Sequence, residues 1–360
     1  MKIGIVGLPN VGKSSLFTAL TRKVVPRENY PFCTIDPNVG VAMVPDPRLD
    51  ALAKVSASEK IIPAVVEFVD IAGLVKGAHK GEGLGNKFLA HIKEVDAIAH
   101  VVRAFESGDI HHVEGAVNPR QDIETILLEL AMTDLEQVSK QMEGLAGKAR
   151  TGNTDSAKHY AALEKIFAAL NKGEPARNAA LSLEELLLVK DLNLLTQKPM
   201  LYIINISERE HTLPVPTLLA QLGLALPEDA VLPLHIQLEA ELIDLPSEEV
   251  AEYLAAVGLS ETGLNQFIQS SYALLNLISF FTSGEKETRA WTIRAGTLAP
   301  QAAGVIHTDM EQGFIRAEVV HWNDFVAVGG WASAKQKGLA QLEGKEYVVQ
   351  DGDVCYFRFA

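Results

Sequence analysis

The sequence predicts an α/β fold with a mainly parallel sheet, an inserted helical hairpin, and a small, mostly β domain at the carboxyl end. Hydrophobic runs without alternation recur along the first part of the chain with helical patterns between them, which is typical of a parallel sheet covered on both faces. After Leu277 the pattern changes to alternating and aromatic-rich segments, which favour strands of a separate domain. A chain of 360 residues can form two or three domains.

The first predicted strand is the β-branched run from Lys2 to Gly7. It enters a glycine-containing turn, and helical spacing follows over 14–20. Strand, loop and helix in this order are typical of the start of a nucleotide-binding α/β domain. Further buried strands of the sheet are predicted at 64–69, 97–102 and 200–204.

A helical hairpin is predicted between the last two of these strands. Apolar residues recur there at three- and four-residue steps, with Asp134 as an interruption and a polar break at 147–156. The stretch from Val138 to Arg177 contains seven Lys or Arg and four acidic residues. The hairpin is therefore either a mildly positive arm or an ordinary solvated helix surface with internal ion pairs.

The carboxyl-terminal domain is predicted from three strand-like segments and from the tight turn Asp351-Gly352-Asp353 before the last of them. The segments are 289–293, 313–319 and 354–359. The sequence therefore predicts a nucleotide domain formed by 1–122 and 197–277, the inserted hairpin at 123–196, and the terminal domain at 278–360.

Composition narrows the class of protein. The formal net charge of −14 argues against a global electrostatic affinity for nucleic acid. Cys33 and Cys355 are too far apart in sequence for a zinc motif and too few for a disulfide framework. No apolar run reaches the roughly 20 residues that span a bilayer, and the amino terminus does not resemble a signal peptide. We expect a cytoplasmic monomer without membrane attachment.

A phosphate-binding loop at 7–14 carries the first functional prediction. Gly7-Leu8-Pro9-Asn10-Val11-Gly12-Lys13-Ser14 matches G-x-x-x-x-G-K-[ST] between a strand and a helix. Its backbone N–H groups would cradle phosphate oxygens, Lys13 would contact the β- and γ-phosphates, and the Ser14 hydroxyl would bind Mg²⁺. The nucleotide-binding residues expected here are Asn10, Val11, Gly12, Lys13, Ser14 and Ser15.

A strand ending in D-x-x-G at 70–73 indicates a switch NTPase rather than a small-molecule kinase. Asp70 would lie near Mg²⁺, and the N–H of Gly73 would sense the γ-phosphate. Between this element and the phosphate loop, Asn29-Tyr30-Pro31-Phe32-Cys33-Thr34 is the plausible first switch. Thr34 is the second candidate Mg²⁺ ligand, through its hydroxyl.

The predicted base-reading motif departs from that of GTPases. Guanine is read by N-K-x-D, whose aspartate accepts from the ring N–H and the exocyclic amine, but here the strand ends in Asn205-Ile206-Ser207-Glu208. The lysine is replaced by Ile206 and the aspartate by the longer Glu208. Adenine has an acceptor where guanine has a donor, so backbone groups near Ile206 are the alternative readers. The change weakens guanine recognition without proving adenine recognition.

Several motifs together resemble the YchF family, the Obg-like ATPase branch of the translation-factor P-loop NTPases. They are G-L-P-N-V-G-K-S at 7–14, N-Y-P-F-C-T-I-D-P-N at 29–38, D-I-A-G-L-V-K-G-A-H-K-G-E-G-L-G-N at 70–86, N-I-S-E at 205–208, and the segments 289–293 and 307–319. The resemblance implies a Ras-like G domain and a terminal β-grasp (TGS) domain. It also implies ATP preferred over GTP, slow hydrolysis, Mg²⁺ at Ser14 and Thr34, and adenine contact at Ile206.

The resemblance further implies association with the ribosome (the large subunit or the 70S particle), contact with ribosomal RNA, and roles in translation and stress. The position after D-x-x-G, where many GTPases place a water-orienting side chain, is Leu74. The family's proposed water-positioning histidine aligns with His112, so His112 and Lys13 are the predicted catalytic residues. Two alternatives remain open: a GTPase for ribosome assembly, and a nucleotide-gated adaptor whose hydrolysis is dispensable.

Overall fold

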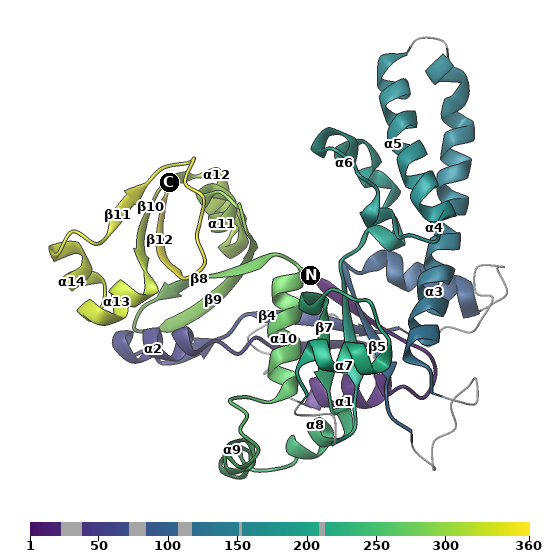
Figure 1. Cartoon of the computed structure of the whole chain (residues 1–360). Coiled ribbons are helices and arrows are strands. Elements are labelled where there is room, and N and C mark those ends of the chain that lie inside the picture. Colours follow the sequence, from purple (N-terminus) through teal and green to yellow (C-terminus); the bar gives the residue numbers. More distant parts are fainter. Residues whose placement is uncertain (23–37, 72–83, 107–116, 151–152, 209–212) are drawn as a thin grey trace. The chain divides into compact units, whose positions relative to one another are not determined.

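The computed structural model describes residues 1–22, 38–71, 84–106, 117–150, 153–208 and 213–360 (Figure 1). These residues form two compact units. The first consists of the described residues of 1–22, 38–40 and 68–263, and the second of 41–67 and 264–360. The boundaries do not coincide with those of the three predicted domains, whose division stays a prediction.

A six-stranded sheet in the order β2-β4-β1-β5-β6-β7 is the centre of the first unit, and the end of β2 (41–43) and the start of β4 (65–67) belong to the second. The pairs β1–β5, β5–β6 and β6–β7 are parallel, which confirms the predicted mainly parallel sheet. Every residue of β5 and β6 is buried, because helices cover both faces. The strands are β2 (Val39–Met43), β4 (Val65–Asp70), β1 (Lys2–Val6), β5 (Ala97–Arg103), β6 (Met200–Asn205) and β7 (Val231–Leu234).

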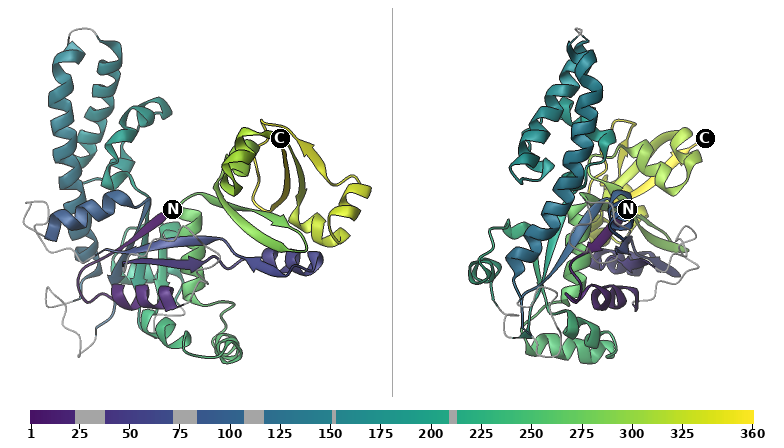
Figure 2. Two further views of the ribbon diagram at one scale, coloured as in Figure 1. Left: turned by 180° about the vertical axis from the view of Figure 1, so that it is seen from behind. Right: turned by 90° about the vertical axis from the view of Figure 1, so that its right-hand side faces the viewer.

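Helices of this unit follow the strands at their carboxyl ends, as in other α/β nucleotide-binding folds. Helix α1 begins at Lys13, directly after the phosphate loop, and α8 follows β7 (Figure 2). The helices outside the insertion are α1 (Lys13–Arg22), α3 (Leu84–Glu94), α7 (Val215–Leu222), α8 (Ile236–Leu242) and α9 (Ser247–Ala256). None of the helices in the described ranges is long and apolar enough to cross a bilayer.

The predicted insertion is a hairpin of two long helices, α4 (Pro119–Arg150) and α5 (Thr154–Asn171), which lie side by side in both Figure 1 and Figure 2. Their facing residues form an apolar core that includes Val138, Leu163 and Ile166. Asp134, which interrupts the apolar pattern, accepts hydrogen bonds from the N–H groups of Leu195 and Thr196 and is wholly buried. It ties α4 to the chain segment that returns to β6.

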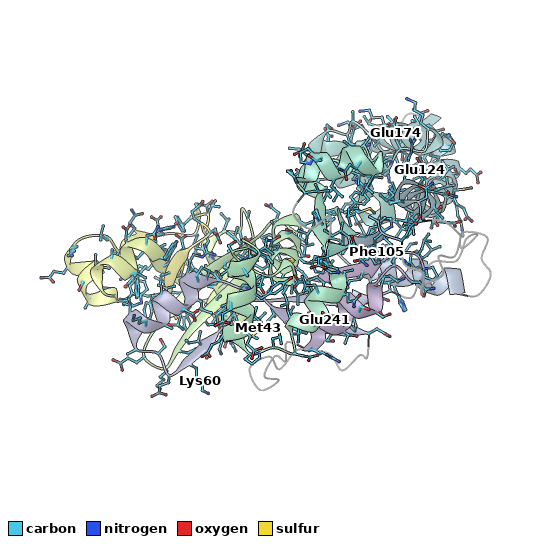
Figure 3. All side chains as sticks on the ribbon, turned by 60° about the horizontal axis from the view of Figure 1, so that its bottom comes forward. Met43, Lys60, Phe105, Glu124, Glu174 and Glu241 are labelled. Carbon is cyan, nitrogen blue, oxygen red and sulfur yellow. The ribbon has the colours of Figure 1, made fainter. Side chains whose placement is uncertain are left out.

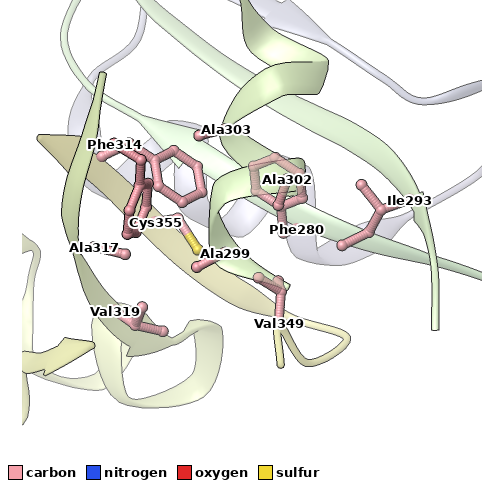
Figure 4. Packing of buried hydrophobic residues seen from close by; sticks show 11 residues of the cluster. Phe280, Ile293, Ala299, Ala302, Ala303, Phe314, Ala317, Val319, Val349 and Cys355 are labelled. Carbon is pink, nitrogen blue, oxygen red and sulfur yellow. The ribbon is translucent and has the colours of Figure 1, made fainter. Parts of the chain in front are cut away.

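The second unit contains a mixed six-stranded sheet in the order β11-β10-β12-β8-β9-β3. Its apolar core lies between this sheet and α11 (Ala299–Ile306) and includes Phe280, Phe314 and the buried Cys355 (Figure 4). A mixed sheet packed against a helix is the arrangement expected of a β-grasp domain. The strands are β11 (Gln341–Glu343), β10 (Phe314–His321), β12 (Asp353–Phe359), β8 (Leu277–Ser283), β9 (Glu287–Arg294) and β3 (Lys60–Ile62).

One strand of this sheet comes from the amino-terminal part of the chain. Strand β3 pairs in parallel with β9, so 60–62 joins the terminal sheet although the sequence analysis assigned it to the nucleotide domain. Helix α2 (Pro47–Ser56), which precedes β3, belongs to the same unit. The remaining helices of the unit are α10 (Gly263–Leu274), which begins one residue before it, α12 (Thr308–Gln312), α13 (Trp322–Val328) and α14 (Trp331–Gln336).

Candidate nucleotide-binding site

Two glycines allow the phosphate loop to fold against the sheet. A Cβ atom on Gly7 would lie 2.5 Å from the carbonyl oxygen of Val101 in β5, which is too close for any side chain. Gly12 has a φ of 108°, a backbone conformation that L side chains rarely adopt, and a Cβ there would lie 2.7 Å from Nδ2 of Asn205. The loop therefore sits directly on strands β5 and β6, at the carboxyl edge of the sheet where nucleotides bind.

Lys13, predicted to contact the β- and γ-phosphates, is the first residue of α1 and is only 8 % exposed. Its ammonium donates to the carbonyl oxygen of Leu8 over 2.6 Å, within the same loop. Burial lowers the pKa of Lys13 to about 8, and the nearby negative charge of Asp70 opposes part of that shift. A buried ammonium whose charge is compensated mainly by a carbonyl oxygen is strongly stabilised when an anion binds beside it. A phosphate site requires a positive charge of this kind.

Asp70, the predicted Mg²⁺-side residue, is the last residue of β4. Partial burial raises the pKa of its carboxyl group, while the positive charge of Lys13 lowers it. The structure thus brings Lys13 and Asp70 close enough to interact electrostatically across the end of the sheet. This is the pair that a Mg²⁺-bound triphosphate requires, a cation for the phosphates and a carboxylate for the metal shell.

The hydroxyl-bearing residues of α1 face open space beside the loop. Ser14 and Ser15 are exposed, and they line a pocket of about 300 Å³ together with residues further along α1 and on α8. Asn10, in the loop itself, is also exposed. The other lining residues, which the sequence analysis missed, are Thr18, Ala19, Arg22 and Ala240. The four-residue spacing of Ser14, Thr18 and Arg22, which places them on one helix face, was the available signal.

Asn205 joins the two halves of the predicted site. Its side-chain amide donates to the carbonyl oxygen of Val11 over 2.9 Å, and its side-chain oxygen accepts from the N–H of Ile236 at 3.4 Å. The side chain is 5 % exposed, so both contacts are shielded from water. Asn205 therefore fixes the phosphate loop to the end of β6 and to the start of α8, the region where the base is expected.

The structure limits how Ile206 can read a base. Its side chain is 1 % exposed, and its N–H donates to the carbonyl oxygen of Leu234 over 3.1 Å. That N–H group is therefore engaged with β7 and is not the backbone group that the sequence analysis expected to pair with the edge of a base. Glu208 is exposed at the end of the described segment.

Strand β5 carries two buried polar residues that the sequence analysis did not assign. His100 is fully buried, and neither ring nitrogen has a hydrogen-bond partner among the described residues. Burial, helped by the charge of Lys13, lowers the pKa of His100 to about 3, so the ring stays neutral. Arg103, at the end of the strand, donates from Nε to the carbonyl oxygen of Phe105, which Figure 3 labels.

Several residues named in the sequence analysis lie outside the described residues. They are the whole first switch at 29–34 with Cys33 and Thr34, Gly73 of D-x-x-G, Leu74 after it, and the predicted catalytic residue His112. The structure brings together the phosphate-loop residues, Asp70, and Asn205 with Ile206. The roles of all these residues stay predictions.

Known proteins resemble this chain over its whole length. A family model described as a 50S ribosome-binding GTPase matches residues 2–139, and the carboxyl-terminal model of the YchF GTPases, described as a protein of unknown function, matches residues 277–360. A protein of Haemophilus ducreyi named ribosome-binding ATPase YchF is 52 % identical over 359 residues, covering 99 % of each chain.

More distant relatives agree with this match. The Obg-like ATPase 1 of rice (Oryza sativa) is 41 % identical over 363 residues, which cover all of this chain and 92 % of the rice protein. A solved structure of the YchF GTPase of Schizosaccharomyces pombe has a TM-score of 0.88 and 39 % sequence identity, covering 99 % of this chain and 97 % of that one. The similarity therefore extends over both units of the fold.

Proposed function

Because this chain belongs to the YchF family, we propose that it is a ribosome-associated ATPase that acts as a nucleotide-dependent switch in translation and stress responses. Binding and slow hydrolysis of Mg-ATP to ADP and phosphate would set the switch. The phosphate loop carries this proposal: buried Lys13 lies beside Asp70, and Asn205 fixes the loop to the strand that ends in N-I-S-E. The curated names of the relatives support the ATPase activity and the ribosome as partner.

The residues present fit a magnesium-bound triphosphate. Gly12 lets the loop lie directly against Asn205 and Ile236, where a Cβ would have no room, Ser14 offers a hydroxyl, and Asp70 offers a carboxylate. When bound, Mg²⁺ neutralises phosphate charge and orients the terminal phosphoryl group. We assign Ser14 and Thr34 as its ligands, with Asp70 beside them. Backbone N–H groups of 10–15 and the ammonium of Lys13 would hold the phosphates, and Gly73 would contact the γ-phosphate.

Hydrolysis would be slow because Leu74 has no polar group with which to orient water. His112 would take this role from another loop, as the family resemblance implies. We expect His112→Ala to abolish most turnover and to leave ATP affinity unchanged. Single-turnover hydrolysis and nucleotide affinity of the variant are measured to check this. Unchanged turnover would show that His112 does not orient the attacking water.

The preference for ATP rests on the departure at Ile206 and Glu208 from the guanine-reading pattern. Competition of ATP and GTP for a fluorescent nucleotide measures it directly. We expect ATP to displace the probe at lower concentration than GTP. The opposite order would favour a GTPase that assists ribosome assembly.

The hairpin is the proposed electrostatic contact with ribosomal RNA, although ion pairs reduce its free charge. Lys158 pairs with Glu184 at 2.7 Å and Lys165 with Glu185 at 2.7 Å. Lys140 of α4 and Lys172, which directly follows α5, are both exposed. Changing Lys140, Lys148 and Lys172 to Glu should weaken ribosome binding and reduce its salt dependence. If this variant binds the ribosome as tightly as the wild type, the hairpin is not the electrostatic contact with ribosomal RNA.

A nucleotide-gated adaptor is the second candidate, since Leu74 replaces the usual water-orienting residue. In an adaptor the bound state carries the function, so hydrolysis can be lost without effect. Complementation of a deletion strain separates the two proposals. Rescue by His112→Ala but not by Lys13→Ala supports the adaptor, whereas failure of both supports the hydrolytic switch.

A further inference from the structure

The carboxyl end of helix α3 is capped by side chains that lie about a hundred residues later in the chain. The carbonyl oxygen of Lys93 accepts from Nδ2 of Asn193 at 2.9 Å and from Nζ of Lys198 at 3.2 Å. The same ammonium donates to the carbonyl oxygen of Val95 at 2.5 Å and to Oδ1 of Asn193 at 3.0 Å. The last carbonyl groups of a helix have no partner within it. The end of α3 is therefore fixed by residues outside the helix.

The capping residues belong to the segment 192–198, which lies between α6 (Leu183–Val189) and β6 and is tied to α4. Gln137 of α4 donates from Nε2 to the carbonyl oxygen of Leu192 at 2.6 Å, and its Oε1 accepts from the ammonium of Lys93 at 3.3 Å. Asp134, one helical turn earlier, binds two N–H groups of the same segment. A joint therefore connects the end of α3 to the hairpin within the first unit. We call it the α3 joint, and its residues are Lys93, Gln137, Asn193 and Lys198.

The burial of Lys198 is unfavourable in itself. The residue is 8 % exposed, and its ammonium donates to three neutral oxygens. Burial lowers the pKa of Lys198, and the negative charges of Asp96 and Asp134 oppose that shift. An apolar side chain of similar length, such as that of methionine, would fill the same space without the desolvation of a charge. What the ammonium adds is a fixed position for the end of α3, because it binds two carbonyl groups there.

Helix α3 leads back to the proposed nucleotide site. It begins at Leu84, and the residues before it, 72–83, lie outside the described residues and include Gly73, the proposed γ-phosphate contact. The 11 residues of the helix rise by about 16 Å. Phe88 and Ile92 are buried, so the helix packs against the rest of the unit between its two ends. Because rigid helices carry displacements along their length, a shift at the start of α3 reaches the α3 joint at its other end.

We propose that the α3 joint conveys the state of the bound nucleotide to the helical hairpin. This inference rests on the proposed function and names the residues that connect its two sites, the phosphate loop and the hairpin. With triphosphate bound, the contact at Gly73 sets one position of α3, and the joint passes that position to α4. With diphosphate the contact is absent. Gln137, Asn193 and Lys198 are positioning residues, because they act through α3. Coupling between two sites is reciprocal, so a partner that prefers the ATP-bound hairpin raises ATP affinity by the same factor.

Hydrogen exchange of the full chain tests the proposal without ribosomes. It is measured with saturating Mg²⁺ and either a non-hydrolysable ATP analogue or ADP, and peptides that cover 7–16, 130–140 and 190–198 are followed. We expect the exchange rates in 130–140 and 190–198 to differ at least about fivefold between the two nucleotides, at the lower end of usual couplings. Protection of 7–16 by both nucleotides shows that both are bound.

Two variants separate transmission from simple stabilisation of the fold. Lys198→Met with Asn193→Gly removes the cap of α3, and glycine keeps the left-handed backbone at position 193, where φ is 46°. Arg177→Met is the matched control, because Nη1 of Arg177 donates to carbonyl oxygens of the same segment, at 196 (3.1 Å) and 198 (3.4 Å), rather than to α3. In the double variant the difference between ATP analogue and ADP at 130–140 should fall below about twofold, whereas the control should keep it.

Gln137→Leu is a milder change for the case that the double variant does not fold. It removes the contacts of α4 with Lys93 and Leu192 while the buried ammonium stays, and it should reduce the nucleotide-dependent difference at least about twofold.

Three outcomes overturn the proposal. The first is equal exchange at the α3 joint with both nucleotides although 7–16 is protected. The second is a difference that persists in the joint variants even where their melting temperature falls, since the cap is then only structural. The third is an equal loss of the difference in Arg177→Met. Absence of protection at 7–16 with either nucleotide would contradict the proposed function, and this inference with it.

Discussion

The phosphate loop and helix α4 of the hairpin both bury charged residues, and Lys13 of the first and Asp134 of the second have different hydrogen-bond partners. Lys13 is 8 % exposed, and its ammonium donates to one loop carbonyl. Asp134 is fully buried and accepts from two backbone N–H groups and from the hydroxyl of Thr196 at 2.6 Å. Hydrogen bonds within the fold compensate the charge of Asp134, whereas they compensate the charge of Lys13 only in part.

This difference fits a structural role for Asp134 and the proposed phosphate-binding role for Lys13. Three donors aimed at Asp134 compensate much of the cost of burying its carboxylate, so its contribution is to stability. Burial of the Lys13 ammonium raises the free energy of the folded chain, and in the proposed function a bound phosphate would offset that cost. Substitutions at the two sites should therefore act on different quantities.

The largest effect expected is that of Lys13→Ala on ATP binding. Loss of a buried cation from a charge pair costs about 2–5 kcal/mol, which weakens affinity roughly 30-fold to several thousand-fold. Calorimetric titration with Mg-ATP measures the loss. The thermal stability of the free protein should not fall, since an unfavourable buried charge is removed. A large drop in melting temperature would contradict the functional assignment.

Asp134→Ala should instead destabilise the chain by about 3 kcal/mol or more, because it leaves buried donors of Leu195 and Thr196 without an acceptor. Denaturant unfolding in the absence of nucleotide measures this change. Asp134→Asn is the matched control, since it keeps one acceptor oxygen and should lose less. ATP affinity of the folded variant should stay within about twofold of wild type.

Asn205→Ala tests the connection between the phosphate loop and the base-reading region. It removes the hydrogen bond to the Val11 carbonyl and leaves a small cavity under Gly12, so ATP affinity should fall about tenfold. Asn205→Asp keeps the volume but replaces the donor with an acceptor, and should be no better. Equal affinity of wild type and both variants would show that the connection is dispensable.

The most gradual effect is the pH dependence of stability due to Lys13, which is spread over the range between its two pKa values. Its pKa of about 8 in the folded chain lies below the ordinary lysine value of 10.5, so the unfolded chain binds more protons between these values. Stability from this group therefore rises with pH from about 8 to 10.5, by at most about 1.4 kcal/mol per pH unit. Denaturation of wild type and Lys13→Met across this range should show the slope only in wild type.

Local patterns predicted four of the six strands of the first sheet, and missed β2 and β7. The runs at 64–69, 97–102 and 200–204 correspond to β4, β5 and β6 to within one residue at each end, since these strands are mainly apolar and β5 and β6 are buried throughout. The phosphate loop was equally predictable from the sequence, because its chemistry requires fixed residue types at fixed spacing.

Contacts between residues far apart in the chain could not be predicted from the sequence. Asp134 stood out only as a break in an apolar pattern, since its partners lie about sixty residues later in the chain. Strand β3 has three residues and little pattern of its own, so nothing local indicated that it pairs with β9. The same limit applies to the pocket beside α1, whose wall from α8 is distant in sequence.

The hydrogen bond from Asn205 to Val11 joins residues 194 positions apart, and it has a consequence for how base preference can change. Glu208 lies three residues further along and is exposed, so it can be exchanged without disturbing this hydrogen bond, whereas Ile206 is 1 % exposed and is constrained by packing. In the proposed site, a laboratory selection for a new base should therefore accept substitutions at Glu208, accept only apolar residues of similar size at Ile206, and reject substitutions at Asn205.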